Sequence, residues 1–317
     1  MIRIVATGGT VQNTPARRIP VEDVIADLRK AYLDSEDVVL PEYDVREVIR
    51  TGSEDFTYKE WVEIACAVDE AAQAPEVTGV VITHGTFTAE ETSYFLHLTV
   101  HTNVPVVVVC SQRKHGTVGN DGDHNLWSAL RVAASEEAAG RGVVLVINEE
   151  IHCAREVKKV NQRPGGFWSG RLGLLGSVEK DRVSFYRSPT RRHTETSEFD
   201  IRELEELPRV DIAASYPGDD GTAVRAFVEA GARGIVIAGF TYSGEPHRLA
   251  LPEIERAIAK GIPVVLTSRG NQGRVPHGED GFVHGDTLSP QKARILLALG
   301  LTKTDDAGEM QRIFDQY

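Results

Sequence analysis

Two threonines in this sequence stand where an apolar run gives way to a turn, a common position for catalytic side chains. ATGGT at 6–10 follows the run IRIV and ends in Thr10, and THGT at 83–86 follows TGVVI and ends in Thr86. A hydroxyl is a weak nucleophile until a base accepts its proton, so this chemistry also needs a basic group such as a lysine. The pair indicates hydroxyl chemistry, although one strand-end threonine alone is more often an ordinary turn residue.

The two glycines before Thr10 invite comparison with the loops that bind dinucleotides. Gly8 and Gly9 permit unusual backbone dihedrals and the close approach of a ligand. The spacing differs from GxGxxG, because Gln12 and Asn13 follow where a third glycine would stand. No strand ending in an acidic residue follows about 20 residues later. The sequence therefore disfavours a nucleotide cofactor.

Two histidines have a spacing that can bind zinc. His97 and His101 are four residues apart on an expected helix. No HExxH glutamate accompanies them and no third ligand is evident, so the sequence favours a packing or surface role over a metal site.

The elements that must position the two threonine turns follow an alternating pattern. Runs rich in valine and isoleucine are typical of strands buried on both faces, as in a parallel sheet. These runs lie at 2–7, 78–84, 104–111, 142–148, 234–240 and 262–268. Amphipathic stretches expected to be helical separate most of them. The expected fold class is therefore α/β with a mostly parallel sheet.

The alternation stops between about residues 186 and 208, where the chain is polar and has no clear apolar period. This break predicts three parts: an amino-terminal catalytic domain over 1–187, a linker over 188–208 and a carboxy-terminal domain over 209–317.

Charge and composition limit the partners. The formal net charge is −12 and no basic block offsets it, so nucleic acid and anionic membrane surfaces are not expected as partners. No window approaches the roughly 20 apolar residues of a membrane span. The opening MIRIVATGGT reads as a buried strand rather than a signal peptide. Three widely spaced cysteines form no disulfide framework, which favours reduced thiols and a cytoplasmic location.

Several ordered motifs resemble those of the bacterial L-asparaginase/glutaminase family. They are ATGGT, THGT with the following AEETSYFLHLTV, NDGDHNLWSALRVAA, AREVKKVN and the tail SPQKARILLALGL. The resemblance runs nearly end to end. It implies a flavodoxin-like parallel-sheet amino-terminal domain, a smaller α/β carboxy-terminal domain and a homotetramer of intimate dimers with active sites at the subunit interface. It also implies no metal or organic cofactor, and hydrolysis of a small amide through a threonine acyl-enzyme that releases ammonia.

The resemblance assigns roles residue by residue. Thr10 matches the primary nucleophile, and Thr86 matches a second threonine that orients the substrate or the attacking water. Lys159, rather than Lys158, matches the lysine that acts with Thr86. Ser53 matches a serine that binds the α-carboxylate of the substrate, assisted by the backbone around Gly52. With the departures from the family pattern included, the expected substrate-binding residues are Gly9, Arg17, Gly52, Ser53, Glu54, Gly85, Phe87 and Tyr242.

One position departs sharply from the family pattern. Phe87 stands where the family has an aspartate, which neutralises the α-ammonium of the substrate and joins the threonine–lysine relay. An unpaired ammonium buried against a phenyl ring would cost several kcal/mol of desolvation. A cation–π contact would recover roughly 0.5–2 kcal/mol. Phe87 therefore argues against free asparagine as the substrate.

Other departures lie around the same site. Glu54 replaces the usual glutamine after Ser53, and the segment after Thr10 offers Arg17 and Arg18 instead of a tyrosine. Arginine suits a carboxylate, because its planar donor fork matches that group. In the carboxy-terminal domain, Tyr242 stands where contacts from a neighbouring subunit are expected.

These departures lead to one preferred hypothesis and two alternatives. We expect an amidohydrolase for a carboxamide or lactam that has no free α-amino group, with Phe87 packing against the group in its place. The first alternative is a slow L-asparaginase/glutaminase that uses Glu54 to bind the ammonium. The second is a non-catalytic small-molecule-binding protein on the same scaffold, which the joint retention of Thr10, Thr86 and Lys159 disfavours.

Overall fold

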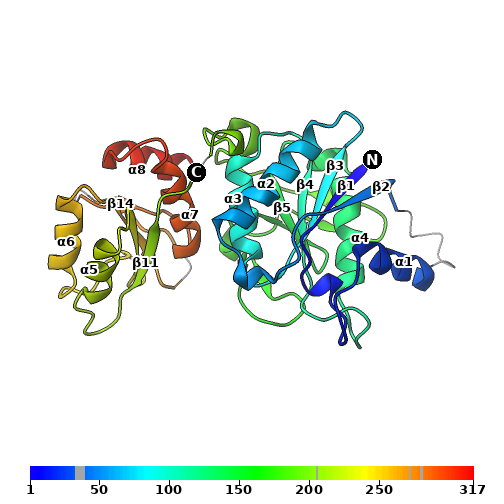
Figure 1. Cartoon of the computed structure of the whole chain (residues 1–317), viewed down its shortest axis with the longest axis horizontal. Helices are drawn as coiled ribbons and strands as arrows, with labels where there is room; N and C mark the ends of the chain where they lie inside the picture. Colours follow the sequence, from blue (N-terminus) through cyan, green and yellow to red (C-terminus); the bar gives the residue numbers. More distant parts are fainter. Residues whose placement is uncertain (33–39, 205, 271–272, 279–280) are drawn as a thin grey trace. The chain divides into compact units, whose positions relative to one another are not determined.

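The chain divides into two compact units, Met1–Arg202 and Glu203–Tyr317. The structure is a computed structural model that describes residues 1–32, 40–204, 206–270, 273–278 and 281–317. Each unit is built around its own sheet (Figure 1). The division falls inside residues 188–208. Within that stretch Ser197 donates a hydrogen bond to the Leu98 carbonyl and Phe199 is buried, so these residues pack onto the amino-terminal unit.

Eight strands form the sheet of the amino-terminal unit, in the order β10-β9-β6-β5-β4-β3-β1-β2. The part β2-β1-β3-β4-β5 is parallel, and its order is that of flavodoxin-like folds. Strands β6, β9 and β10 extend it with antiparallel pairing. The strands are β1 (Ile2–Ala6), β2 (Tyr43–Glu47), β3 (Gly79–Thr83), β4 (Val106–Val109), β5 (Val143–Ile147), β6 (Glu150–Cys153), β9 (Gly176–Val178) and β10 (Val183–Phe185).

Four α-helices cover the two faces of this sheet: α1 (Val21–Tyr32), α2 (Tyr58–Gln73), α3 (Ala89–Thr99) and α4 (Gly122–Ala133). Figure 1 shows α1 and α4 on one side and α2 and α3 on the other. Val24 and Ile25 of α1 and Leu126 and Leu130 of α4 are fully buried in one apolar cluster with side chains of the strands. Burial of this kind stabilises each helix by roughly 25 cal/mol per Å² of apolar surface removed from water.

A small two-stranded sheet lies beyond β6, where β7 (Lys158–Lys159) pairs antiparallel with β8 (Phe167–Trp168). Gly166 supports the turn between them, because a side chain there would meet the Asn161 carbonyl at 2.5 Å. This short hairpin carries Lys159 at a fixed position in the register, opposite Phe167.

Four parallel strands form the sheet of the carboxy-terminal unit, in the order β11-β12-β13-β14. Buried Ile235, Ile237 and Leu266 lie in its core cluster. The strands are β11 (Val210–Ala214), β12 (Gly234–Gly239), β13 (Val264–Ser268) and β14 (Val283–His284), and the helices are α5 (Thr222–Glu229), α6 (Leu251–Ala259), α7 (Pro290–Gly300) and α8 (Ala307–Gln316). The two units confirm the expected α/β class, with a larger and a smaller parallel-sheet domain.

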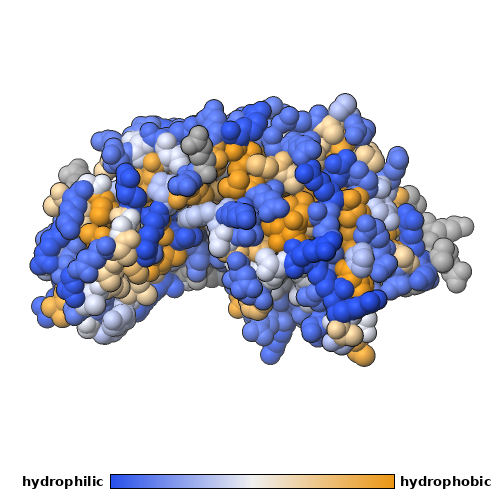
Figure 2. All heavy atoms as spheres, in the orientation of Figure 1, coloured by the Kyte–Doolittle hydropathy of each residue, from blue (hydrophilic) through white to orange (hydrophobic). Residues whose placement is uncertain are grey.

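The polarity of the surface and the length of the helices both bear on which partners the chain could have. Hydrophilic residues predominate on the face shown in Figure 2, and apolar residues gather there in separate patches. Among the described residues, no helix has both the length and the apolar character needed to cross a membrane.

Candidate active site

The first threonine turn leaves the carboxyl end of β1 and is held against the end of β3. Thr7 Oγ1 donates to the Thr83 carbonyl at 2.6 Å, and Thr83 Oγ1 donates to Gln12 Oε1 at 2.9 Å. Gly9 has φ 83° and lies so close to the His84 carbonyl that a Cβ atom would overlap it. Only glycine fits there without strain. The turn therefore delivers Thr10, the first residue of the 3₁₀ helix η1 (Thr10–Gln12), beside the second turn.

This meeting point is where such a sheet is expected to bind ligands. Chain order reverses between β1 and β3, since β2 lies on the far side of β1 and β4 on the far side of β3. Open α/β sheets bind ligands outside the carboxyl ends of strands at such a reversal. Thr10 is half-buried, and its hydroxyl has no hydrogen-bond partner within the part of the chain that the structure describes.

The second threonine is paired with the predicted lysine. Lys159 Nζ donates to Thr86 Oγ1 at 2.7 Å, across 73 residues of sequence. The backbone N–H of Lys159 donates to Glu90 Oε2 at 3.0 Å, which ties the β7–β8 hairpin to the first turn of α3. Thr86 is buried, whereas Lys159 is half-buried. The structure thus joins a hydroxyl to an amine that is able to exchange a proton with it.

The ammonium of Lys159 lies in an environment that disfavours its charge. Burial lowers the pKa of Lys159, while Cys110 and Glu90 act in the opposite direction. Its Nζ atom lies 4.9 Å from the ring centroid of Phe87. Among the described residues no carboxylate forms an ion pair with Nζ. A lysine with a lowered pKa is neutral for a larger fraction of molecules near pH 7, which suits it to accept a proton.

The predicted substrate-binding serine lies against the same turn. Ser53 begins the 3₁₀ helix η2 (Ser53–Asp55), and its hydroxyl lies where a Cβ atom on Gly85 would be. Thr88 Oγ1 donates to the Ser53 carbonyl at 2.9 Å, which fixes η2 to the start of α3. The Ser53 hydroxyl is buried and has no hydrogen-bond partner among the described residues. A buried unpaired hydroxyl is able to hydrogen-bond a ligand that reaches it.

Glu54 folds back over the segment that leads into Ser53. Its carboxylate oxygens lie 2.7 Å from the position a Cβ atom would take on Gly52. Glu54 is exposed, so the carboxylate lies at the surface next to Ser53.

His84 shapes the turn that precedes Thr86. Its Nδ1 atom lies 2.7 Å from the Gly85 carbonyl, and its ring meets the Phe56 ring edge-on at 5.2 Å between centroids. Burial lowers the pKa of His84 to about 4, so the ring is neutral at pH 7 and its Nδ1 carries the proton that this hydrogen bond needs.

Phe87 itself is largely exposed, at 65% of its surface. Its neighbour in sequence, Thr86, is 6% exposed, so the chain turns from the interior to the surface within one residue. The ring therefore lies over the lysine without being part of the core.

The two arginines after Thr10 lie in different surroundings. Arg17 is exposed in a turn, where its N–H donates to Thr14 Oγ1 at 3.0 Å, and it lines a cavity of about 370 Å³ that also includes Asp27 and His115. The guanidinium of Arg18 instead packs against Gly8, with Cζ 2.6 Å from the position of a Cβ atom there. The sequence offered both arginines, and residue type alone did not distinguish them.

His115 anchors the beginning of this segment. Its N–H donates to the Asn13 carbonyl at 2.8 Å, Nδ1 lies 2.8 Å from Asp123 Oδ1 and Nε2 lies 3.2 Å from Asp27 Oδ2. Burial opposes the charge of His115, but hydrogen bonds with Asp123 and Asp27 outweigh it and raise its pKa.

Asp121, in the NDGD motif, and Tyr242 form none of the contacts described above. Asp121 accepts backbone hydrogen bonds from Gln112 and Arg113 and forms no ion pair with Lys159 in the described part of the chain. Tyr242 belongs to the carboxy-terminal unit, is 84% exposed and has φ 91°, an unfavourable value for a tyrosine.

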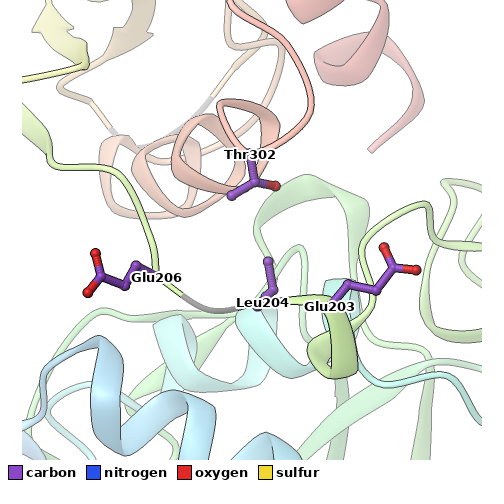
Figure 3. A pocket seen from close by; sticks show the side chains of 4 residues that line it. All are labelled: Glu203, Leu204, Glu206 and Thr302. Carbon is purple, nitrogen blue, oxygen red and sulfur yellow. The ribbon is translucent and has the colours of Figure 1, made fainter.

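Neither the histidines nor the pockets of the described residues add a metal site. His97 Nδ1 accepts from the Val143 N–H at 3.0 Å and His101 Nε2 lies 2.9 Å from the Phe199 carbonyl, so both have structural roles. No cluster of metal-binding side chains occurs among the residues described. A pocket of about 520 Å³ in the carboxy-terminal unit is lined by Glu203, Leu204, Glu206 and Thr302. The side chains of its two glutamates point away from each other (Figure 3).

Two family models match the chain on either side of its polar middle. Residues 1–191 match the asparaginase amino-terminal domain, and residues 209–314 match the glutaminase/asparaginase carboxy-terminal domain. The chain belongs to the asparaginase family. It is an asparaginase-like amidohydrolase, a class that acts on carbon–nitrogen bonds other than peptide bonds.

Individual relatives align over nearly the whole chain. A glutaminase-asparaginase of Pseudomonas aeruginosa is 36% identical and covers 99% of this chain and 90% of its own length. L-asparaginase 2 of Bacillus subtilis is 35% identical and covers 100% of this chain and 86% of its own length. A solved structure titled a probable cytoplasmic L-asparaginase from Campylobacter jejuni superposes with a TM-score of 0.91 at 35% identity, covering 100% of this chain and 99% of its own.

Proposed function

We propose that this asparaginase-family enzyme hydrolyses a carboxamide or lactam that has no free α-amino group. The observation that carries the proposal is the pairing of Lys159 with Thr86 under the ring of Phe87, where no carboxylate of the described residues is bonded to the ammonium. This arrangement provides a proton-transfer pair for amide chemistry. It provides no counter-charge for a substrate ammonium at position 87, and an unpaired charge is expensive to desolvate.

In the proposed reaction Thr10 is the nucleophile. Its Oγ1 attacks the amide carbon, the carbon–nitrogen bond breaks, and the nitrogen takes the hydroxyl proton. A carboxamide releases this nitrogen as ammonia, whereas a lactam keeps it as an amine on the acyl group. The acyl group then forms an ester with Thr10. Water oriented by Thr86 and Lys159 attacks this ester, and Lys159 accepts the proton of the water through Thr86. The carbon–oxygen bond to Thr10 then breaks, the acid is released, and Lys159 returns the proton to Thr10 Oγ1.

The residues proposed to bind the acyl part of the substrate lie around the turns that carry Thr10 and Thr86. The unpaired hydroxyl of Ser53 lies against Gly85, Gly52 precedes it, and Gly9 brings the nucleophile turn alongside. Their close backbone packing supports a preorganised site, because hydrogen-bond donors held in place need not reorganise during the reaction.

A slow asparaginase or glutaminase is the second candidate, and one observation favours it. The Glu54 carboxylate lies over Gly52, next to Ser53, where it offers a negative charge to an ammonium. The relatives named above are called asparaginases and glutaminase-asparaginases. The family assignment and the hydrogen bond between Lys159 and Thr86 both speak against the third alternative, a binding protein without activity.

Turnover across a substrate panel, measured as ammonia release for the open-chain amides and as ring opening for the lactams and cyclic imides, separates the three candidates. The panel holds asparagine, glutamine, succinamate, aromatic amides, lactams and cyclic imides, each assayed with the wild-type protein and with Thr10→Ala. We expect turnover of at least one amide without an α-amino group and far slower turnover of asparagine. Efficient asparagine hydrolysis, with kcat/KM above about 10⁴ M⁻¹s⁻¹, would refute the proposal. Ligand binding without turnover of any compound would favour the binding protein.

Assembly and location follow the family resemblance. We propose a homotetramer in which Tyr242 of a partner subunit completes the site, and sedimentation analysis together with Tyr242→Ala kinetics tests this.

The cytoplasmic location remains a prediction, since one structural relative is titled cytoplasmic while a relative from Haemophilus influenzae is named periplasmic.

A further inference from the structure

The segment between the nucleophile and α1 forms a tight reversal that separates its two arginines. Asn13 and Arg18 form an antiparallel bridge, and Thr14 Oγ1 donates to the Arg17 carbonyl at 2.7 Å. Arg17 lies at the exposed end and lines the cavity beside His115. Arg18 lies on the side of Gly8 and is half-buried.

The guanidinium of Arg18 lies flat against the backbone of the nucleophile turn. Its Cζ, Nη2 and Nη1 atoms lie 2.6, 2.7 and 2.8 Å from the position a Cβ atom would take on Gly8, two residues before Thr10. Nη2 donates to the Ile49 carbonyl at 2.9 Å, and the chain runs on from there to Ser53. Arg18 therefore lies between the turn that carries the nucleophile and the segment that carries the substrate-binding serine.

The charge of Arg18 is only partly matched. Glu47 Oε1 lies 3.6 Å from Nη2, which is longer than a hydrogen bond, and Glu47 Oε2 accepts from Arg50 Nη2 at 2.9 Å. The Glu47 carboxylate is therefore shared between the guanidinium groups of Arg18 and Arg50. Among the described residues the Nε and Nη1 donors of Arg18 have no hydrogen-bond partner. The side chain is 23% exposed, so a small anion is able to reach it.

We propose that Arg18 binds a carboxylate of the substrate, and that the substrate class is therefore the monoamides of dicarboxylic acids without an α-amino group. The inference rests on the proposed function, because it describes the same site. A guanidinium offers two parallel N–H donors to a carboxylate, which fixes orientation as well as adding affinity. Recognition then comes from an anion bound by Arg18, while the ring of Phe87 faces the part of the substrate that carries no charge.

The test compares two substrates that differ only in this charge. Succinamate carries the carboxylate, and butanamide has a methyl group in its place. We expect the wild-type kcat/KM to be higher for succinamate. Arg18→Gln should lower kcat/KM for succinamate by about 10- to 100-fold, mainly through KM, and leave butanamide within about twofold, as expected for the loss of a charged hydrogen bond. Arg18→Lys should restore part of the loss, because it keeps the charge without the fork.

Arg50→Gln is the matched control, since Arg50 shares Glu47 but is 82% exposed. Its kinetics should match the wild type for both substrates. Succinate binding, measured by calorimetry, gives a readout that does not need turnover: Arg18→Gln should weaken it by a similar factor and Arg50→Gln should not.

Three results would overturn the assignment. They are an equal loss for both substrates in Arg18→Gln, a selective loss in Arg17→Gln instead, and a wild-type enzyme that prefers butanamide and does not bind succinate. These outcomes leave the proposed function standing, because butanamide also has no amino group. Efficient asparagine turnover would instead refute the proposed function itself.

Discussion

Replacing Phe87 by aspartate tests the central claim, that the missing negative charge at this position sets substrate choice. The ring is 65% exposed, so its removal should change the free energy of unfolding by no more than about 0.5 kcal/mol, as for most surface substitutions. Folding should therefore not obscure the kinetics. Phe87→Asn is the matched control, because asparagine has nearly the shape of aspartate without its charge.

The expected change in selectivity follows from the ammonium of asparagine. A carboxylate at position 87 would provide a charged hydrogen bond worth about 1.5–3 kcal/mol, which corresponds to roughly 10- to 100-fold in kcat/KM. In Phe87→Asp the ratio of kcat/KM for asparagine to that for succinamate should rise by this factor. Phe87→Asn should leave the ratio nearly unchanged. The assay is ammonia release with both substrates.

The substitution Phe87→Asp should also shift the pH dependence of activity toward higher pH. A carboxylate near Lys159 Nζ carries a full negative charge and attracts the ammonium more strongly than the quadrupole of the Phe87 ring does. The pKa of Lys159 should therefore rise in Phe87→Asp. If neutral Lys159 accepts the proton, activity increases as pH rises through this pKa. The increase should then occur at higher pH in Phe87→Asp than in the wild type.

Two results would show that this reasoning is wrong. The first is an unchanged selectivity ratio in a folded Phe87→Asp enzyme. The second is an equal rise in Phe87→Asn, which would attribute the effect to space rather than to charge. In the second case removal of the ring, and not the carboxylate, would admit asparagine.

Three further predictions concern the support of the site. Thr86→Val, which removes the hydroxyl bonded to lysine, should lower kcat by about 10²- to 10⁴-fold in the ammonia assay, and unchanged activity would exclude Thr86 from proton transfer. Gly9→Ala should abolish activity and lower Tm, since a methyl group would overlap a backbone carbonyl; an active, equally stable variant would contradict the described turn. The raised pKa of His115 means that its charged hydrogen bonds stabilise the fold fully below its unfolded pKa of about 6.5, and that this stability is lost as pH rises through the folded value. His115→Gln should therefore lower the free energy of unfolding by about 1–2 kcal/mol at pH 5 and by less at pH 8.5 in urea titrations, and an equal loss at both would exclude a charged role.

The fold was predictable where burial leaves a strong pattern. The runs 2–7 and 78–84 correspond to β1 and β3. Strand β2 was not expected, because it lies at the sheet edge, is only partly buried and reads YDVRE instead of a valine-rich run. An edge strand takes its position from pairing with β1, which no local pattern reveals.

The site was predictable in its residue types but not in its contacts. The family resemblance supplied Thr86 and Lys159, yet the hydrogen bond between them spans 73 residues and depends on how the β7–β8 hairpin packs. Arg17 and Arg18 are identical in chemistry, and only the reversal at Thr14 places Arg18 against Gly8, in the turn that leads to Thr10. The sequence also did not predict that Glu90 accepts a hydrogen bond from the backbone N–H of Lys159, because a glutamate in the first turn of a helix is common.

The contact of Gly9 with the His84 carbonyl has a consequence for how new specificities arise on this scaffold. Thr10, the proposed nucleophile, is placed by the contact of Gly9 with a backbone carbonyl and by hydrogen bonds within the two turns, none of which involves Phe87 or Glu54. Phe87 and Glu54 are exposed, and each adjoins this framework without supporting it. A combinatorial library at positions 54 and 87 should therefore yield mostly folded enzymes with intact turnover machinery and diverse substrate ranges.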